Sequence, residues 1–198
     1  MSQLKTEKVI LLKRVKYGES DLILHGINAS GAKVHLFARA ALKSKKRFGG
    51  GVLEPLNCIQ AVYRETEREG SEPLYQLQEA SLIHGFPKLR SDYERLELAF
   101  YFIKSISHAA QMGTVDGEPL FNLLGNAMKA AETTSNLLHL KLHFEVKLLA
   151  IQGVLPQIPS RDVFMNSSVT ASENLTLPNP EDWVSVQKEV ALAMSQLP

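Results

Sequence analysis

Hydrophobic and polar residues alternate with a period of about two over roughly the first 85 positions. The expected strands are five short runs separated by polar turns such as Asn28-Ala29-Ser30-Gly31: 9–12, which is apolar throughout, then 21–27, 33–38, 57–66 and 74–85. A period of two with β-branched residues is typical of strands. No long helical pattern lies between these runs, which argues against parallel α/β units. The pattern predicts a five-stranded antiparallel barrel of the OB-fold type.

After Phe86-Pro87 the spacing of apolar residues changes to about 3.6. Apolar residues at this spacing form a stripe along one helix face. A first stripe predicts a helix over about 89–111, and two further stripes and the start of a last helix follow it in the chain. The three stripes are Tyr93, Leu96, Phe100, Ile103 and Ile106; Phe121, Leu124, Met128 and Ala131; and Leu137, Leu140, Phe144, Leu148 and Ile151. Asn179 as a cap and Pro180 as the first helical residue predict a last helix over about 181–194.

The two patterns divide the chain into two predicted domains and an α+β fold. Residues 1–85 are expected to form the barrel and residues 86–198 an all-helical domain. The segment 157–178 is rich in Ser, Thr, Asn and Pro and is expected to be an irregular loop.

Charge is distributed unevenly between these regions. Residues 1–50 contain eleven Lys or Arg and three acids, a net charge of +8, whereas the whole chain of 198 residues has a net charge of +1. A basic N-terminal module attached to a mildly acidic remainder indicates a polyanionic partner at one end, either nucleic acid or an anionic membrane surface.

The densest basic run, Lys43-Ser44-Lys45-Lys46-Arg47-Phe48-Gly49-Gly50-Gly51, predicts a mobile, positively charged loop. Its cations can neutralise phosphates, Phe48 can stack on a base, and the glycines supply flexibility. A solvated linker between two folded parts is the alternative interpretation. The predicted DNA-binding residues are Lys13, Arg14, Lys16, Lys33, Arg39, Lys43, Lys45, Lys46, Arg47 and Phe48.

These cations would act together only if the ends of the first and third strands converge with the loop on one groove. About four phosphate contacts to a single strand would give a salt slope of about −3, so that affinity falls roughly 50-fold between 50 and 200 mM salt.

Catalytic and metal-binding motifs give a weaker signal. No nucleophile elbow and no phosphate loop ending in Gly-Lys-Ser/Thr occurs, so we predict no enzyme activity. His139 and His143 lie four positions apart on one helix face and could bind a metal, but an ordinary helix with histidines near its edge is the favoured interpretation. We predict no cofactor and no metal.

Bulk composition indicates where the protein works. The single cysteine, Cys58, excludes an intrachain disulfide, and no apolar run approaches the ~20 residues of a membrane helix. The start of the chain has no apolar stretch of the kind found in secretion signals. We predict a cytoplasmic protein with no membrane partner.

Several motifs, taken in order, resemble the RecO family of bacterial recombination mediators. The resemblance covers roughly residues 7–156 and rests on the order and spacing of the pieces. They are 9–14 (VILLKR), 17–23 (YGESDLI), 31–33 (GAK), 38–41 (ARAA), 43–50 (KSKKRFGG), 53–56 (LEPL), 77–80 (LQEA), 86–90 (FPKLR), 144–149 (FEVKLL) and 153–156 (GVLP).

The resemblance implies an OB-fold followed by a helical domain. It also implies binding of single- and double-stranded DNA, annealing of complementary strands, and loading of recombinase onto DNA covered by single-strand-binding protein. Implied partners are RecR and the acidic, hydrophobic C-terminal tail of that coating protein. A bacterial source and association with the nucleoid when DNA is bound are implied in the same way.

One region departs from the family pattern. Many members carry a four-cysteine zinc cluster after the position of Pro156, but residues 158–170 contain no cysteine. We therefore expect a zinc-free variant with a shortened C-terminal region. A protein-interaction adaptor of the repair machinery, with weak or no DNA binding of its own, is the alternative function.

Overall fold

A computed structural model describes residues 4–65, 74–110 and 117–197. It divides into two compact units, the first made of residues 1–86 and 110–121, and the second of 87–109 and 122–198. The division after residue 86 lies one position from the expected boundary. Residues 110 and 117–121 also group with the first unit, although the expected boundary placed them in the helical domain.

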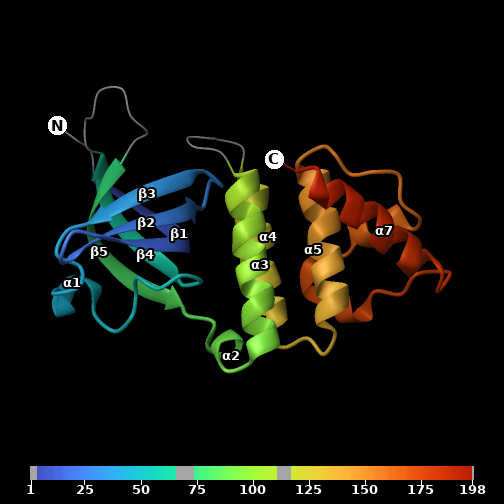
Figure 1. The fold of residues 1–198 in the computed structure, drawn as a ribbon, viewed down its shortest axis with the longest axis horizontal. Coiled ribbons are helices and arrows are strands. Elements are labelled where there is room, and N and C mark those ends of the chain that lie inside the picture. Colours follow the sequence, from blue (N-terminus) through green and yellow to red (C-terminus); the bar gives the residue numbers. More distant parts are fainter. Residues whose placement is uncertain (1–3, 66–73, 111–116, 198) are drawn as a thin grey trace. The chain divides into compact units, whose positions relative to one another are not determined.

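The first unit contains a closed five-stranded barrel, as the hydrophobic pattern predicts (Figure 1). Its strands are β1 (Leu4–Tyr17), β2 (Asp21–Asn28), β3 (Lys33–Ala38), β4 (Cys58–Glu65) and β5 (Leu74–His84). The order around the barrel is β1-β2-β3-β5-β4. The expected all-antiparallel pairing is wrong at one seam, because β3 and β5 run parallel, with His35 opposite Leu74 and Phe37 opposite Gln76.

Alternating residues of the strands point into the barrel. Val9, Leu24, Leu36 and Ile59 have no exposed surface and belong to one apolar core. β1 is much longer than the four residues that the apolar run suggested, because the polar residues on both sides of that run also pair with neighbours. A register shift between Leu11 and Lys13 marks a bulge, which bends β1 as it passes from β4 toward the end of its pairing with β2.

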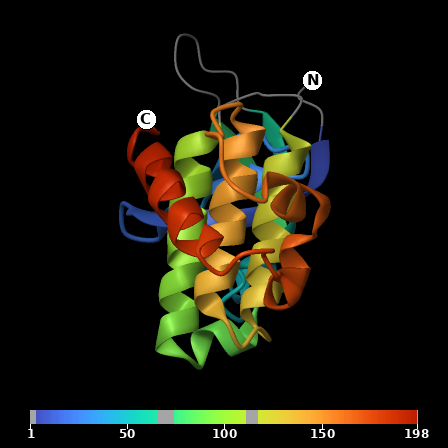
Figure 2. The same cartoon turned by 90° about the vertical axis from the view of Figure 1, so that its right-hand side faces the viewer.

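The second unit is helical. Its elements, together with the helix α4 that begins in the first unit, are α2 (Pro87–Arg90), α3 (Tyr93–Ala109), α4 (Glu118–Ala131), α5 (Leu137–Ile151), α6 (Arg161–Asn166), the 3₁₀ helix η1 (Val169–Asn174) and α7 (Asp182–Ser195). Figure 2 shows α7 (red) lying across α5 (orange). Among the described residues, no helix is long and apolar enough to cross a membrane.

The core of this unit forms around α5. Eight residues of α5 are buried, including Glu145, so apolar residues on more than one side of it are covered by neighbours. The ring centres of Phe102 on α3 and Phe144 on α5 lie 4.3 Å apart. In α3 the expected stripe is partly wrong. Ile106 is fully buried as expected, but Tyr93 and Phe100 are exposed, and Phe102, which lies outside the stripe, is fully buried.

The segment 157–178 is not an irregular loop, because it contains α6 and η1. Two side chains of α5 hold it. His143 makes hydrogen bonds to the Ser172 hydroxyl at 3.1 Å and to the Phe164 carbonyl at 3.0 Å. Lys147 donates to the Met165 carbonyl at 2.7 Å. The last helix also begins slightly later than expected, with Glu181 rather than Asn179 as its cap residue.

Candidate nucleic-acid interface

The basic run folds into a short helix, α1 (Lys45–Phe48), rather than remaining a loop. The Ser44 side chain accepts a hydrogen bond from the Arg47 backbone N–H at 3.4 Å, as a residue that caps a helix start does. Gly50 and Gly51 then take φ values of +72° and +74°, which other residues adopt only with strain. These two glycines therefore reverse the chain, whereas the sequence had suggested flexibility alone.

Phe48 lies in the barrel core. Its side chain is 6% exposed and packs in the same apolar cluster as Leu24, Leu36 and Leu53. A ring in this position presents no open face on which a base can stack. We therefore remove Phe48 from the expected contacts and assign it to the packing that anchors α1 to the barrel.

Two of the expected cations make contacts within the protein. Arg47 donates from its guanidinium to the Arg39 carbonyl at 2.8 Å and to the Ser44 hydroxyl at 3.4 Å. Arg14 forms an ion pair with Glu54, and both side chains are 37% exposed. Arg47 thus holds α1 to the end of β3, and Arg14 holds β1 to the segment that follows α1.

The structure brings the remaining basic residues of the run close to the turn between β1 and β2. The Leu42 N–H donates to the Ser20 carbonyl at 3.0 Å, and the Ala40 N–H donates to the Asp21 carboxylate at 2.7 Å. This turn follows Tyr17, the last residue of β1, and Lys16 precedes Tyr17. The exposed cations at this end of the barrel are Lys16, Arg39, Lys43 and Lys46, which we call the basic cluster. The side chain of Lys45 lies outside what the structure describes.

Lys33 does not join the basic cluster. It begins β3, whereas Arg39 follows the last residue of that strand, so the length of the strand, about 17 Å, separates the two ends. Lys13 lies on the outer side of β1, opposite His25. Lys16 and Arg39 therefore lie at the same end of the barrel as the basic run, whereas Lys33 lies at the opposite end of β3.

Comparison with known proteins identifies this barrel. The model of the family described as "Recombination protein O N terminal" matches residues 1–86. The chain is 32% identical over 154 residues to the DNA repair protein RecO of Syntrophus aciditrophicus, covering 78% of this chain and 57% of that protein. It is 34% identical over 152 residues to the same-named protein of Anaeromyxobacter dehalogenans strain 2CP-C, covering 75% and 57% of the two chains.

Over about three quarters of its length, the chain is similar to these RecO proteins. A third relative, DNA repair protein RecO of Maridesulfovibrio salexigens, is 33% identical over 153 residues, covering 76% of this chain and 59% of that protein. The chain thus matches a little over half the length of these RecO relatives. The closed barrel carrying the basic cluster is the part of the chain that the family model matches.

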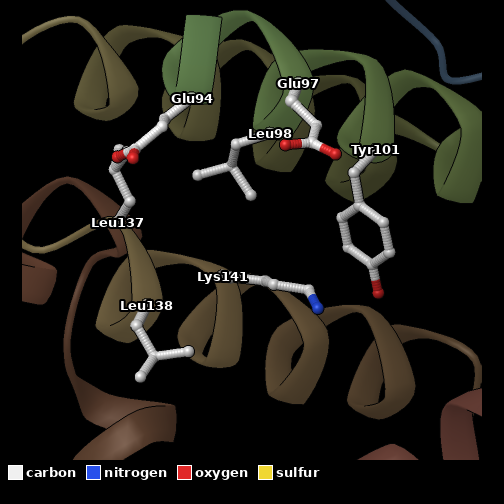
Figure 3. Close-up of a pocket in the computed structure, with 7 residues that line it drawn as sticks. All are labelled: Glu94, Glu97, Leu98, Tyr101, Leu137, Leu138 and Lys141. Carbon is white, nitrogen blue, oxygen red and sulfur yellow. The ribbon is translucent and has the colours of Figure 1, made fainter.

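The helical unit carries two pockets. The first, a cavity of about 430 Å³, lies between α3 and the beginning of α5. Figure 3 shows Glu94, Glu97 and Tyr101 on the α3 side, with Leu138 and Lys141 on the α5 side. Two carboxylates and a leucine that is 60% exposed give this pocket an acidic and apolar lining.

The second pocket, also about 430 Å³, is more basic. Its cations are Lys104 and Lys141, with His108 nearby. Its apolar wall comes from Ala191, Met194 and Leu197, at the C-terminal end of α7 and just beyond it. This combination suits an acidic peptide with apolar side chains.

One buried carboxylate, Glu145, lines the second pocket and contacts Tyr101 and Lys141, which line both pockets. Glu145 accepts a hydrogen bond from the Tyr101 hydroxyl, and the Lys141 ammonium lies 3.7 Å from the same carboxylate oxygen. Burial, followed by this hydrogen bond to Glu145, raises the pKa of Tyr101 above its ordinary value. Tyr101 therefore stays protonated and donates to Glu145 at any physiological pH.

The two histidines of α5 serve the helical core. Both ring nitrogens of His143 have hydrogen-bond partners, and burial lowers its pKa to about 4. The His139 ring stacks on Trp183 with ring centres 3.9 Å apart. Across the described residues, no group of three or more His, Cys, Asp or Glu is arranged to hold a metal ion.

Proposed function

We propose that this protein is a DNA-binding recombination mediator that acts without catalysing a covalent step. The basic cluster carries the proposal: four exposed cations gather at one end of a barrel that matches the model of the RecO N-terminal family. Lys and Arg that neutralise phosphates release bound counterions, which favours binding at low salt. Lys45 extends the same basic run, and Arg14 becomes available if its ion pair with Glu54 opens.

Strand annealing follows physically from such a surface. Neutralising the phosphates of two strands lowers their mutual repulsion, while bases that remain exposed can still pair. We further propose that the protein helps load recombinase onto DNA covered by single-strand-binding protein, with RecR as a partner. Work in the bacterial cytoplasm, and on the nucleoid when DNA is bound, follows from this role.

A salt titration tests the DNA-binding part. Binding of labelled single-stranded and duplex oligonucleotides is measured by fluorescence anisotropy between 50 and 200 mM salt, with annealing of complementary strands followed in parallel. The triple variant Arg39→Ala, Lys43→Ala and Lys46→Ala should lose most of the affinity, and its salt slope on single strands should be about 2 less steep. Arg47 is left intact because it also holds α1 in place.

The matched control replaces two exposed lysines of the helical unit, Lys129 and Lys188, with alanine. This control should bind DNA as the wild type does. A salt slope near zero for the wild type, or equal losses in the control and the triple variant, would overturn the proposal.

The second pocket favours one additional function, that of an adaptor. We propose that it receives an acidic, apolar peptide of the kind found at the C-terminus of single-strand-binding protein. Lys104 and Lys141 would attract the acidic residues, and Met194 and Leu197 would contact the apolar side chains. The Glu145 carboxylate offsets part of the charge of Lys141, so Lys104 should contribute more to the attraction.

A labelled acidic peptide that ends in apolar residues and a C-terminal carboxylate tests this site. Lys104→Glu should weaken binding at least tenfold, whereas Lys129→Glu, on α4, should leave it unchanged. Equal affinity of both variants would exclude the pocket. Peptide capture that persists after nuclease treatment, in a protein whose basic cluster has been neutralised, would show that the adaptor role does not need DNA.

A further inference from the structure

The outer side of β1, β2 and β3 carries a row of rings that the basic cluster does not account for. Leu24 on β2 and Leu36 on β3 point into the core. Successive side chains of a strand point to opposite faces, so the neighbours of these leucines along each strand point outward. The outward residues are His25 on β2 and His35 and Phe37 on β3. Because directly paired residues share a face, Tyr17 also points outward, opposite Asp21.

These rings meet in two pairs across the strands. Tyr17 and Phe37 lie with ring centres 5.9 Å apart and planes at 85°, and His25 and His35 lie 4.4 Å apart at 73°. Tyr17 is 57% exposed. Phe37 and the two histidines are half-buried. We call these four residues the ring face.

An exposed tyrosine beside a phenylalanine is costly on a protein surface unless something covers it, since both rings keep apolar area in water. The same outer side is fully buried toward the other end of β1 and β2, where Ile10 and Ile27 are 1% and 0% exposed. The exposure is therefore confined to the part of the face nearest the basic cluster.

Cations lie at both ends of the ring face. Lys13 pairs with His25, and Lys33 is two positions before His35 on the same side of β3. At the other end, the turn after Tyr17 is held against the segment that carries Arg39 and Lys43 by the bond from Leu42 to Ser20. A strand of nucleic acid laid along the face would have cations at its two ends and rings in the middle.

We propose that the ring face stacks the bases of single-stranded nucleic acid, with Tyr17 and Phe37 as the principal contacts. This inference rests on the proposed DNA binding and adds base contacts to it. The ring faces of bases are open only in a single strand, because in a duplex they are covered by neighbouring base pairs. Asp21, the acid on this face, accepts the Ala40 N–H, so that its carboxylate already has a partner.

This placement also reassigns the aromatic contact within the site. The sequence placed a stacking ring at Phe48, within the basic run, but that ring is in the core. The outward-facing aromatic pair comes instead from Tyr17 at the end of β1 and Phe37 near the end of β3. These two residues are twenty positions apart in the chain and are brought together by β2. Phosphate contacts and base contacts are thereby supplied by different segments.

The test compares two labelled oligomers of equal length, an oligothymidylate and an abasic strand with the same phosphates. Wild-type protein should prefer the oligothymidylate. Tyr17→Ala and Phe37→Ala should each lower affinity for it roughly 5- to 150-fold, the range typical for one stacked base, and leave the salt slope unchanged. Tyr17→Trp should keep the preference. Tyr93→Ala removes a tyrosine that is 79% exposed on α3 and should have no effect.

The outcomes separate this inference from the proposed function. Equal affinity of the wild type for the two oligomers would overturn the proposal that the ring face stacks bases, but it would leave the proposed phosphate binding intact. Absence of binding to either oligomer would overturn the proposed function itself. Thermal unfolding of each variant keeps the test decisive, because Tyr17 and Phe37 contribute little to the core and their variants should melt near the wild type; loss of preference in a folded Tyr17→Ala variant supports the proposal.

Discussion

The guanidinium carbon of Arg47 lies 4.8 Å from the ring centre of Phe48, and the two side chains have different tasks. Phe48 is buried in the barrel, whereas Arg47 reaches back to the Arg39 carbonyl. The basic run therefore contains the residues that hold it in place as well as the cations it presents to solvent. Neutralising the whole run at once would mix loss of structure with loss of charge.

Phe48→Ala should destabilise the protein, and Lys46→Ala should not. Removing a buried phenylalanine typically costs about 3–5 kcal/mol, whereas an exposed lysine contributes within about 0.5 kcal/mol. Chemical denaturation of the two variants, with DNA affinity measured on the folded fraction, checks this. Equal stability of the two variants would show that Phe48 is not a core residue.

Gly31→Ala should be among the most damaging single substitutions in the barrel. Gly31 has a φ of +79°, and a Cβ there would lie 1.7 Å from the Gly117 carbonyl oxygen. The strained φ and the overlap of the new Cβ with the backbone act together, and we expect the free energy of unfolding to fall by about 3–5 kcal/mol. The measurement is the free energy of unfolding in denaturant.

Gly18→Ala is the matched control. Gly18 also has a positive φ, +60°, but no atom lies within 4 Å of the position of its Cβ. Only the conformational cost of about 1–2 kcal/mol should remain. If both variants lose the same stability, the close approach of Gly31 to Gly117 does not matter.

His143→Gln should make the stability of the protein depend less on pH between pH 7 and pH 4.5. Burial lowers the pKa of His143 to about 4 in the folded protein, below its ordinary value of 6.5. As the pH falls, the unfolded chain therefore binds this proton before the folded protein does. The contribution of His143 to the free energy of unfolding is complete above about pH 6.5 and is lost as the pH falls toward 4, by at most about 1.4 kcal/mol per pH unit.

The check is the unfolding temperature from pH 7 to pH 4.5 for both proteins. The difference between wild type and variant should shrink as the pH falls. A constant difference would mean that His143 is not neutral in the folded state. Replacement of His108, which is exposed, serves as the control and should leave the profile unchanged.

Glu54→Gln should strengthen DNA binding at low salt. The Glu54 carboxylate pairs with Arg14, and its removal leaves this guanidinium available to phosphates. Exposed ion pairs are typically worth about 0.2–1 kcal/mol, so an affinity gain of roughly 1.5- to 5-fold is expected. The gain should vanish in the double variant with Arg14→Ala, and a gain that persists there would assign the effect to the loss of a nearby negative charge.

Much of the fold could be predicted from the sequence because the strands of the barrel have simple patterns. The run 33–38 alternates strictly, and β3 has the predicted bounds. The long β1 was underestimated because Lys13, Arg14 and Lys16 look like the end of a strand, although an edge facing solvent accepts charged residues. The stripe in α3 failed at Tyr93 and Phe100 because several apolar faces fit the spacing and only packing selects one.

The candidate site was predictable in charge but not in geometry. Local composition marks Lys43 to Arg47 as basic, yet the burial of Phe48 depends on core positions contributed by all five strands of the barrel. The pairing of Tyr17 with Phe37 depends on the strand register, which no local pattern provides. The available signal for Phe37 was an aromatic residue at an outward position of the alternating run 33–38.

The parallel seam between β3 and β5 also determines when this barrel can first exist. His35 pairs with Leu74 and Phe37 pairs with Gln76, and these partners lie nearly forty residues later in the chain. Contacts this distant in sequence are formed late in folding because the chain between them must first be ordered. During synthesis, β1, β2 and β3 can therefore pair as a meander, but closure of the barrel requires that β5 has left the ribosome.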